Sequence, residues 1–172
     1  QFKYTVESFK EKCAKNGLKS SILLVTNGIQ QDEHARFIIE NCERINVSFD
    51  GTPELQNSQR PMRNGRESFR FVDRFIRNCE KYGKRILVRS TIMADCMHKI
   101  GEIVDYVFGN YSNVSVVHIE PMMPFGRAER LDHILGENIS KEFVAEYIKQ
   151  SDRVTCMYPG RELFCTLFDY EL

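Results

Sequence analysis

The sequence predicts an α/β protein with about four parallel strands, and three observations support this class. Stretches of β-branched and aliphatic residues alternate with stretches whose apolar residues recur every three or four positions. The first such strand, residues 21–26, is apolar on both faces, which is typical of a strand covered on two sides. Two strands end in glycine-bearing turns, Val25-Thr26-Asn27-Gly28 and Val47-Ser48-Phe49-Asp50-Gly51. Strands that are joined through helices run parallel, so these polar turns are expected at one edge of the sheet.

The individual elements follow from local periodicity and from helix start and stop signals. The predicted strands are residues 21–26, 45–49, 85–92 and 114–119. The predicted helices cover residues 5–16 and 67–82, a segment capped by Asp32 and a segment capped by Asp95. A long polar connection, residues 50–65, separates the second strand from its helix. Loops at the carboxyl ends of parallel strands build the sites of α/β proteins, so this connection is expected to carry function.

The regular alternation is expected to stop after the fourth strand. The prolines of Pro121-Met122-Met123-Pro124-Phe125-Gly126 forbid a helix, and the chain is predicted to be irregular to about residue 138. Ser140 is expected to cap a short helix, with Ile139 and Val144 as a hydrophobic staple. Residues 153–168 are predicted to form a β-hairpin that turns at Pro159-Gly160.

Composition excludes several classes of protein and of partner. The 172 residues suit one domain with at most a small appendage, and 42% hydrophobic content is enough for a packed core. The 24 basic and 24 acidic residues cancel, so we expect no nucleic-acid partner and no membrane association. The six cysteines lack the close spacing of a zinc motif or of a small disulfide framework. We therefore expect reduced, structural thiols and a cytoplasmic location.

The apolar first strand needs a cover. As an outer edge it would expose an apolar face and unpaired backbone groups. The candidates are the N-terminal helix, the C-terminal hairpin, a second copy of the chain, or a segment outside this sequence. We predict self-association through this edge.

Polar side chains at the strand ends are the first candidates for a site. Asn27-Gly28 is also a common turn pair, so a purely structural role remains open. Ser48 and Asp50 flank Phe49 and share one strand face, where a hydroxyl and a carboxylate could hold a ribose diol. Alternatively, Asp50 braces the turn that follows it.

Arginines supply the other candidates. Four of them, Arg60, Arg63, Arg66 and Arg70, cluster around Asn64-Gly65, and guanidinium groups suit carboxylates and phosphates. Arg89 lies within the third predicted strand, where a charge needs a partner or a polar cavity. Glu120, at the end of the fourth strand, could be that partner, in a site or in a structural pair. The sequence contains no glycine-rich dinucleotide fingerprint, Walker loop, nucleophile elbow or paired-histidine zinc motif.

The order of these motifs resembles the radical SAM family. Thr26-Asn27-Gly28 is followed by Val47-Ser48-Phe49-Asp50-Gly51, by Arg60, and by Gly65-Arg66-Glu67-Ser68-Phe69. Within the family the chain is most similar to the peptide- and protein-modifying (SPASM-type) branch that includes anaerobic sulfatase-maturing enzymes. Pro124-Phe125-Gly126-Arg127-Ala128 resembles the glycine-arginine-alanine segment that follows the last barrel strand of many such enzymes. The resemblance covers roughly residues 1–130.

The resemblance implies a partial, TIM-like (β/α) barrel that binds S-adenosylmethionine on a four-iron–four-sulfur (4Fe-4S) cluster. Reductive cleavage of S-adenosylmethionine then yields a 5′-deoxyadenosyl radical, which abstracts hydrogen from a protein or peptide substrate. In this reading residues 1–130 are the C-terminal portion of the barrel. Residues 131–172 are a helix and hairpin extension, in which Cys156 and Cys165 could begin an auxiliary-cluster region.

The resemblance also implies roles for individual residues. Ser48 would contact the ribose and Arg60 the methionine carboxylate. Asn27 would lie near the cofactor and Met122 near the adenine. Asp50 would brace the strand end rather than touch the ligand.

One family feature is missing from the sequence. The C-x-x-x-C-x-x-C loop that holds the cluster, and the Gly-Gly-Glu motif after the next strand, are absent. Three thiolates hold three irons, so we expect no cluster in this chain and no activity from it alone. The start at Gln1 rather than Met is consistent with a piece of a longer enzyme. The alternatives are a cluster-free α/β binding or scaffold domain and, less favoured, an ordinary nucleotide-binding domain.

Overall fold

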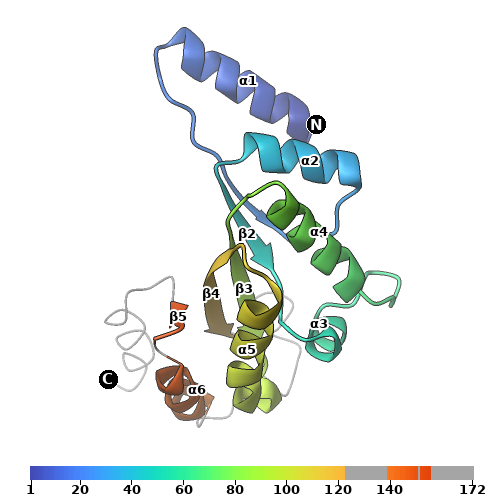
Figure 1. Cartoon of the computed structure of the whole chain (residues 1–172), viewed down its shortest axis with the longest axis vertical. Helices are drawn as coiled ribbons and strands as arrows, with labels where there is room; N and C mark the ends of the chain where they lie inside the picture. The colour runs from blue at the N-terminus through green and yellow to red at the C-terminus, as the bar shows by residue number, and fades with distance from the viewer. Residues whose placement is uncertain (123–138, 151, 156–172) are drawn as a thin grey trace.

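The structure, a computed structural model, describes residues 1–122, 139–150 and 152–155. Figure 1 shows helices alternating with the strands of a single sheet. In chain order the elements are α1 (Phe2–Lys15), β1 (Leu23–Thr26), α2 (Asp32–Asn41), β2 (Arg44–Ser48), α3 (Pro53–Gln59), α4 (Phe69–Lys81), β3 (Ile86–Ile92), the 3-10 helix η1 (Ala94–Lys99), α5 (Ile100–Asn110), β4 (Val114–Pro121), α6 (Ile139–Lys149) and β5 (Val154–Thr155).

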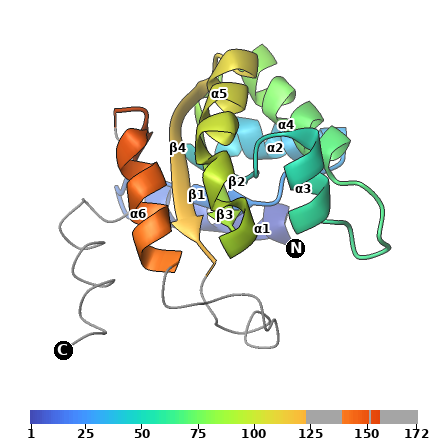
Figure 2. The ribbon, with the colours of Figure 1, turned by 90° about the horizontal axis from the view of Figure 1, so that it is seen from below.

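The sheet is parallel, and its strands follow one another in chain order from β1 to β5. Helices α2, α4 and α5 lie together on one side of it (Figure 2). A doubly wound sheet reverses its strand order and carries helices on both faces, whereas a barrel keeps one order and one helical face. The predicted class, a partial (β/α) barrel with parallel strands, is therefore confirmed.

Burial alternates along β2 and β3 because one face of these strands is covered by the helices. In β2, Ile45 and Val47 are fully buried, while Asn46 and Ser48 are half-buried on the opposite face. We call this opposite face the open face. The core lies between the sheet and α2, α4 and α5. Phe49, the residue after β2, extends into it and packs edge-on against Tyr111.

Helix α4 shows how the sequence builds this core. Its buried residues are Val72, Phe75, Ile76 and Cys79, whose spacing of three and four places them on one face. Cys79 and Cys42 are buried small residues, as predicted, and burial raises the pKa of the Cys79 thiol to about 12. Both thiols are therefore protonated at neutral pH.

Three predicted helix starts are wrong. Asp32 is the first helical residue of α2 rather than its cap, Asp95 lies inside η1, and Ser140 lies inside α6. For the two aspartates, a carboxylate stabilises the positive end of a helix dipole from the first turn as well as from the cap, so sequence does not separate the two positions. Helix α3 was missed altogether, because it is short and polar. Its start signal, Thr52 followed by Pro53, is nevertheless present, and Thr52 Oγ1 accepts the backbone N–H of Leu55 at 3.4 Å.

The C-terminal part differs from the expectation in one respect. Val154 and Thr155 pair in parallel with β4, at Val117 and His118, so the start of the predicted hairpin is a fifth parallel strand. The alternation therefore continues through α6, which was expected as a helix, to β5. The remainder of the hairpin, the Pro124–Ala128 segment, Cys156 and Cys165 lie outside the described residues. The predicted division at residue 130 also falls there and stays a prediction.

The N-terminal helix packs beside α2. Phe2 meets the ring of Phe37 edge-on at 6.2 Å, and Lys10 donates to Asn41 at 2.9 Å. Among the described residues the first strand is an edge that pairs with β2 alone, and its Leu23 and Val25 are 46% and 51% exposed. Among the described residues no helix has the length and apolar character that a bilayer span requires.

Candidate functional site

Glycines with positive φ end β1 and β2 at the carboxyl edge of the sheet. Gly28 has φ +72° and Gly51 has φ +88°, a region that other residues rarely adopt. A Cβ on Gly51 would lie 3.1 Å from the Cα of Ile103, so the turn packs directly on the backbone of α5. The glycines thus let the chain reverse close to the helices, and they leave the polar side chains of the same turns at the sheet edge.

Asp50 is the most tightly held residue at this edge. It is fully buried, and its Oδ2 accepts Nε of Arg60 at 2.7 Å. Its Oδ1 accepts the Ser90 hydroxyl and the Thr91 N–H, both at 3.2 Å. A buried carboxylate is stable only when it is paired and hydrogen-bonded, and Asp50 meets both conditions. Its contacts tie the end of β2 to β3.

A glutamine that sequence reasoning missed completes this arrangement. Gln56, in α3, is 1% exposed. Its Oε1 accepts the backbone N–H of Asp50 at 2.9 Å, and its Nε2 donates to Ser68 Oγ at 2.9 Å. Gln56 therefore joins the end of β2 to the residue that precedes α4. The signal in the sequence was a polar residue on the inner side of a helix, and it was lost because the helix itself was not predicted.

The other predicted site residues are distributed along the same edge. Ser48 is half-buried on the open face, in register with Arg89 of β3. Asn27 is exposed, and its Oδ1 accepts the N–H of Ile29 at 3.1 Å, which closes the turn after β1. Met122 is half-buried after β4, and its N–H donates to the Ile92 carbonyl at 2.8 Å. The structure joins Asp50 and Arg60 directly, while Asn27 and Met122 follow β1 and β4, which have two strands between them in the sheet.

Arg89 and Glu120 form the pair that the sequence suggested. Nε of Arg89 lies 3.0 Å from Oε2 of Glu120, and Nη2 donates to the same oxygen. The other oxygen, Oε1, lies 2.8 Å from Nε2 of the buried His118. Burial by itself would raise the pKa of Glu120, but hydrogen bonds from Arg89 and His118 hold it below its ordinary value. Glu120 is thus an ionised acceptor with both oxygens occupied.

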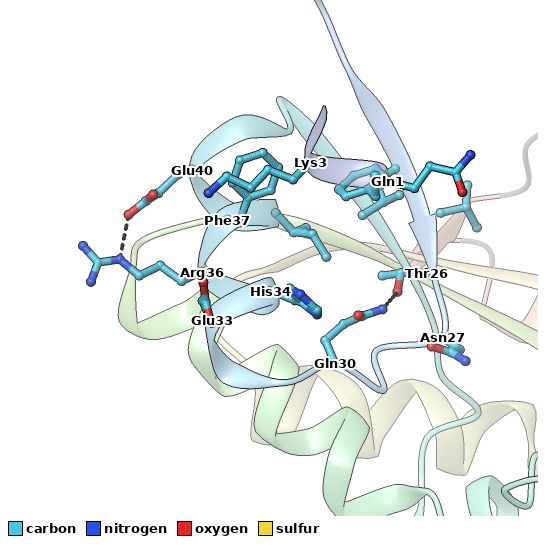
Figure 3. Close-up of a pocket in the computed structure, with 14 residues that line it drawn as sticks. Gln1, Lys3, Thr26, Asn27, Gln30, Glu33, His34, Arg36, Phe37 and Glu40 are labelled. Atoms are coloured by element: carbon cyan, nitrogen blue, oxygen red, sulfur yellow. Dashed lines mark hydrogen bonds and ion pairs between the residues drawn. The ribbon is translucent and has the colours of Figure 1, made fainter. Parts of the chain in front are cut away.

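A groove of about 750 Å³ lies elsewhere, between α1, β1 and α2. Figure 3 shows its polar lining, in which Gln30 donates to Thr26 Oγ1 at 3.3 Å beside His34. Of the predicted site residues, Asn27 alone lines this groove. The groove borders the exposed edge of β1 rather than the Asp50–Arg60 pair, so size alone does not mark the site here.

The fitness of these residues for the implied cofactor can be judged from their chemistry. A guanidinium and a half-buried hydroxyl at one sheet edge fit a carboxylate and a ribose, as S-adenosylmethionine would require. The cluster is different. Within residues 1–122, 139–150 and 152–155 no group of three histidine, cysteine or acidic side chains could hold a metal ion. The described part of the chain therefore does not fit a 4Fe-4S cluster.

Solved structures with a similar fold were found by comparison of the whole chain. The native anaerobic sulfatase-maturing enzyme anSMEcpe, with bound AdoMet and the Kp18Cys peptide, superposes on 91% of this chain with a TM-score of 0.72 and 20% identity. The native enzyme with bound AdoMet superposes on 91% of this chain, with a TM-score of 0.71 and 20% identity. The chain has the fold of a partial radical SAM barrel. It spans about half the length of these solved chains, 46% and 45%.

The radical SAM likeness lies in the structure and not in close sequence similarity. No protein-family model matches the sequence. No curated protein matches it either. The radical S-adenosylmethionine methyltransferase TsrM from Kitasatospora setae, solved with cobalamin and a 4Fe-4S cluster, superposes on 73% of this chain and 26% of its own, at a TM-score of 0.49 and 15% identity. That last similarity is too weak to bear on the fold.

Proposed function

We propose that this chain forms part of the S-adenosylmethionine site of a radical SAM enzyme that modifies a protein or peptide, as sulfatase-maturing enzymes do. The observation that carries the proposal is the superposition of 91% of the chain on anSMEcpe, solved with AdoMet and a peptide. The polar side chains of this chain support it, since they gather at the carboxyl edge of a parallel sheet, where α/β barrels bind their ligands.

Arg60 is the residue that we assign to the methionine carboxylate. Its side chain is 30% exposed, and Asp50 occupies only its Nε. A guanidinium has five N–H donors, so Arg60 retains donors for a ligand carboxylate. Asp50 is a positioning residue in this scheme, because it fixes the guanidinium and does not itself reach the ligand. Ser48 would donate to the ribose, with Asn27 near the cofactor and Met122 near the adenine.

The cluster, when bound, lets S-adenosylmethionine supply the radical that abstracts hydrogen from the substrate. Because the described residues do not offer it a ligand set, its thiolates would come from outside them. The role of this chain is then to bind and orient the cofactor, and we expect no catalysis from it alone. We thus propose both that the substrate of the whole enzyme is a peptide or protein and that this chain alone is inactive.

The test begins with the coding DNA immediately upstream of the Gln1 codon. We expect an in-frame C-x-x-x-C-x-x-C motif followed by Gly-Gly-Glu. A start codon directly before Gln1, or an unrelated segment in that place, would contradict the proposal and favour the cluster-free scaffold.

Binding to the protein encoded by the whole reading frame then tests the site. Arg60→Lys keeps a positive charge beside Asp50 but removes the guanidinium fork. We expect it to weaken S-adenosylmethionine binding about tenfold, the loss of one charge-assisted hydrogen bond. The matched control is Arg63→Lys, since Arg63 is an exposed arginine of the same connection. If calorimetry gave both variants and the parent protein equal affinities for S-adenosylmethionine, Arg60 would not be a residue that binds it.

A further inference from the structure

Positive charge is concentrated in one short segment of an otherwise neutral chain. The 24 basic and 24 acidic residues balance, yet residues 60–70 hold four arginines and only one acidic residue, Glu67. This segment, which we call the arginine loop, connects α3 to the first turn of α4. Figure 2 shows the connection projecting beside α3, on the side away from α6.

Several arginines in this loop and in the helix that follows it are neutralised by a carboxylate. Arg60 is paired with the buried Asp50. Farther along α4, Nε of Arg74 lies 3.5 Å from Oδ1 of Asp32, and Nε of Arg77 lies 3.0 Å from Oδ1 of Asp73.

Three arginines of the loop are left without such a counter-charge. Arg63, Arg66 and Arg70 are exposed, and none has a carboxylate partner within the part of the chain that the structure describes. Arg70 instead lies over the ring of Phe71, 4.7 Å from its centroid. The loop therefore presents uncompensated guanidinium groups to solvent.

The backbone that carries these groups is fixed at its base and closed at its tip. At the base, Asn57 Oδ1 accepts the N–H of Phe69 at 2.9 Å. At the tip, Met62 donates to the Arg66 carbonyl and Gly65 donates to the Met62 carbonyl, both at 2.8 Å. A preorganised backbone lowers the conformational entropy that a binding partner would otherwise remove.

We infer that the arginine loop is a docking surface for an acidic segment of the peptide partner. Guanidinium groups bind carboxylates with charge-assisted hydrogen bonds, and the loop begins at Arg60, in contact with the strand end where we place the cofactor. The inference rests on the proposed peptide-modifying function and names the chemistry of its partner. A nucleic acid fits less well, since residues 60–68 contain no aromatic ring for base stacking and the chain has no net positive charge.

The test compares peptides that differ only in charge. Fluorescence anisotropy would measure binding of a four-glutamate peptide, and of its four-glutamine equivalent, to the protein encoded by the whole reading frame. The double variant Arg63→Gln/Arg66→Gln removes two charges from the loop. The control Lys12→Gln/Lys19→Gln removes two exposed charges on the N-terminal side of β1. Thermal unfolding of both variants, which change exposed residues only, should match that of the parent protein.

We expect the acidic peptide to bind more tightly than the neutral one, and the loop variant to weaken it about fivefold at low salt, as exposed ion pairs of this kind allow. The control should retain parental affinity, and added salt should reduce the difference.

Equal binding of the two peptides, or equal weakening by the control, would overturn the inference. Tighter binding of an oligonucleotide of the same charge through the same arginines would overturn it in favour of nucleic acid. S-adenosylmethionine binding, measured in parallel, should be unchanged in the loop variant, so a failure here is separable from a failure of the proposed function.

Discussion

Glu120 shows how a charged residue is accommodated inside this sheet. Its side chain is 18% exposed, which would disfavour the carboxylate without partners. Arg89 and His118, from the neighbouring strand and from its own strand, each hold one of its oxygens. The sequence left open whether Glu120 forms a structural ion pair or belongs to a site. Since both of its oxygens are occupied, its contacts favour the structural ion pair over a free acid or base.

This arrangement predicts a pH dependence. The pKa of Glu120 is lower in the folded chain than in the unfolded chain, so its stabilisation is fully present above the unfolded pKa of about 4.3 and is lost as pH falls through the folded value. We expect Glu120→Gln to lower the free energy of unfolding by about 1–3 kcal/mol at pH 7, and by less at pH 4. Urea unfolding at the two pH values measures this. The control is the exposed Glu7→Gln, which should have little effect at either pH, and an effect of Glu120→Gln independent of pH would contradict the assignment.

At the scale of elements, the position of the site depends on how closely the strand ends approach the helices. Gly51 turns the chain after β2 while touching α5, and Gln56 of α3 holds the backbone of Asp50 in place. The polar edge is therefore fixed by packing behind it as well as by its own hydrogen bonds.

Gly51→Ala should consequently be costly. The added Cβ would meet the Ile103 backbone at 3.1 Å, and φ +88° is unfavourable for alanine. We expect a loss of about 2–4 kcal/mol in unfolding free energy, from backbone strain together with overpacking. Gly83→Ala is the matched control, since φ there is +64° but nothing lies within 4 Å of the added Cβ. It should cost about 1–2 kcal/mol, the backbone strain alone. Equal losses in the two variants, measured by chemical denaturation, would show that the contact with α5 is unimportant.

At the scale of the whole molecule, the described sheet is open rather than closed. Its edges are β1 and β5, and Leu23 and Val25 leave β1 with an apolar, half-exposed surface. The N-terminal helix packs against α2 through Phe2 and leaves these two side chains exposed. An exposed apolar edge is a template for pairing with another strand.

We therefore expect the isolated chain to self-associate through β1. Val25→Lys should shift it towards the monomer in sedimentation velocity at micromolar concentration, because a charge on an edge strand opposes pairing. Ile148→Lys, which replaces an equally exposed apolar residue on α6, should leave the distribution unchanged. A parent chain that is strictly monomeric under these conditions would count against the expectation.

Sequence by itself determined the features that repeat locally. Apolar periodicity predicted four strands and most of the helices, and the glycine-bearing turns predicted where β1 and β2 end. A charge inside a buried strand required a partner, and Glu120 proved to be that partner for Arg89. These signals depend on neighbouring residues or on a single unmet physical requirement, so they can be recognised from the sequence alone.

Only the tertiary structure decided which distant groups meet. The donors to Asp50 include Ser90 and Thr91, about forty residues away, and no local pattern marks them. The groove between α1, β1 and α2, and the parallel pairing of Val154 with Val117, likewise depend on how elements pack. Hydrophobic burial selects such packings from the whole chain at once, because it depends on the area removed from water and not on position in the sequence.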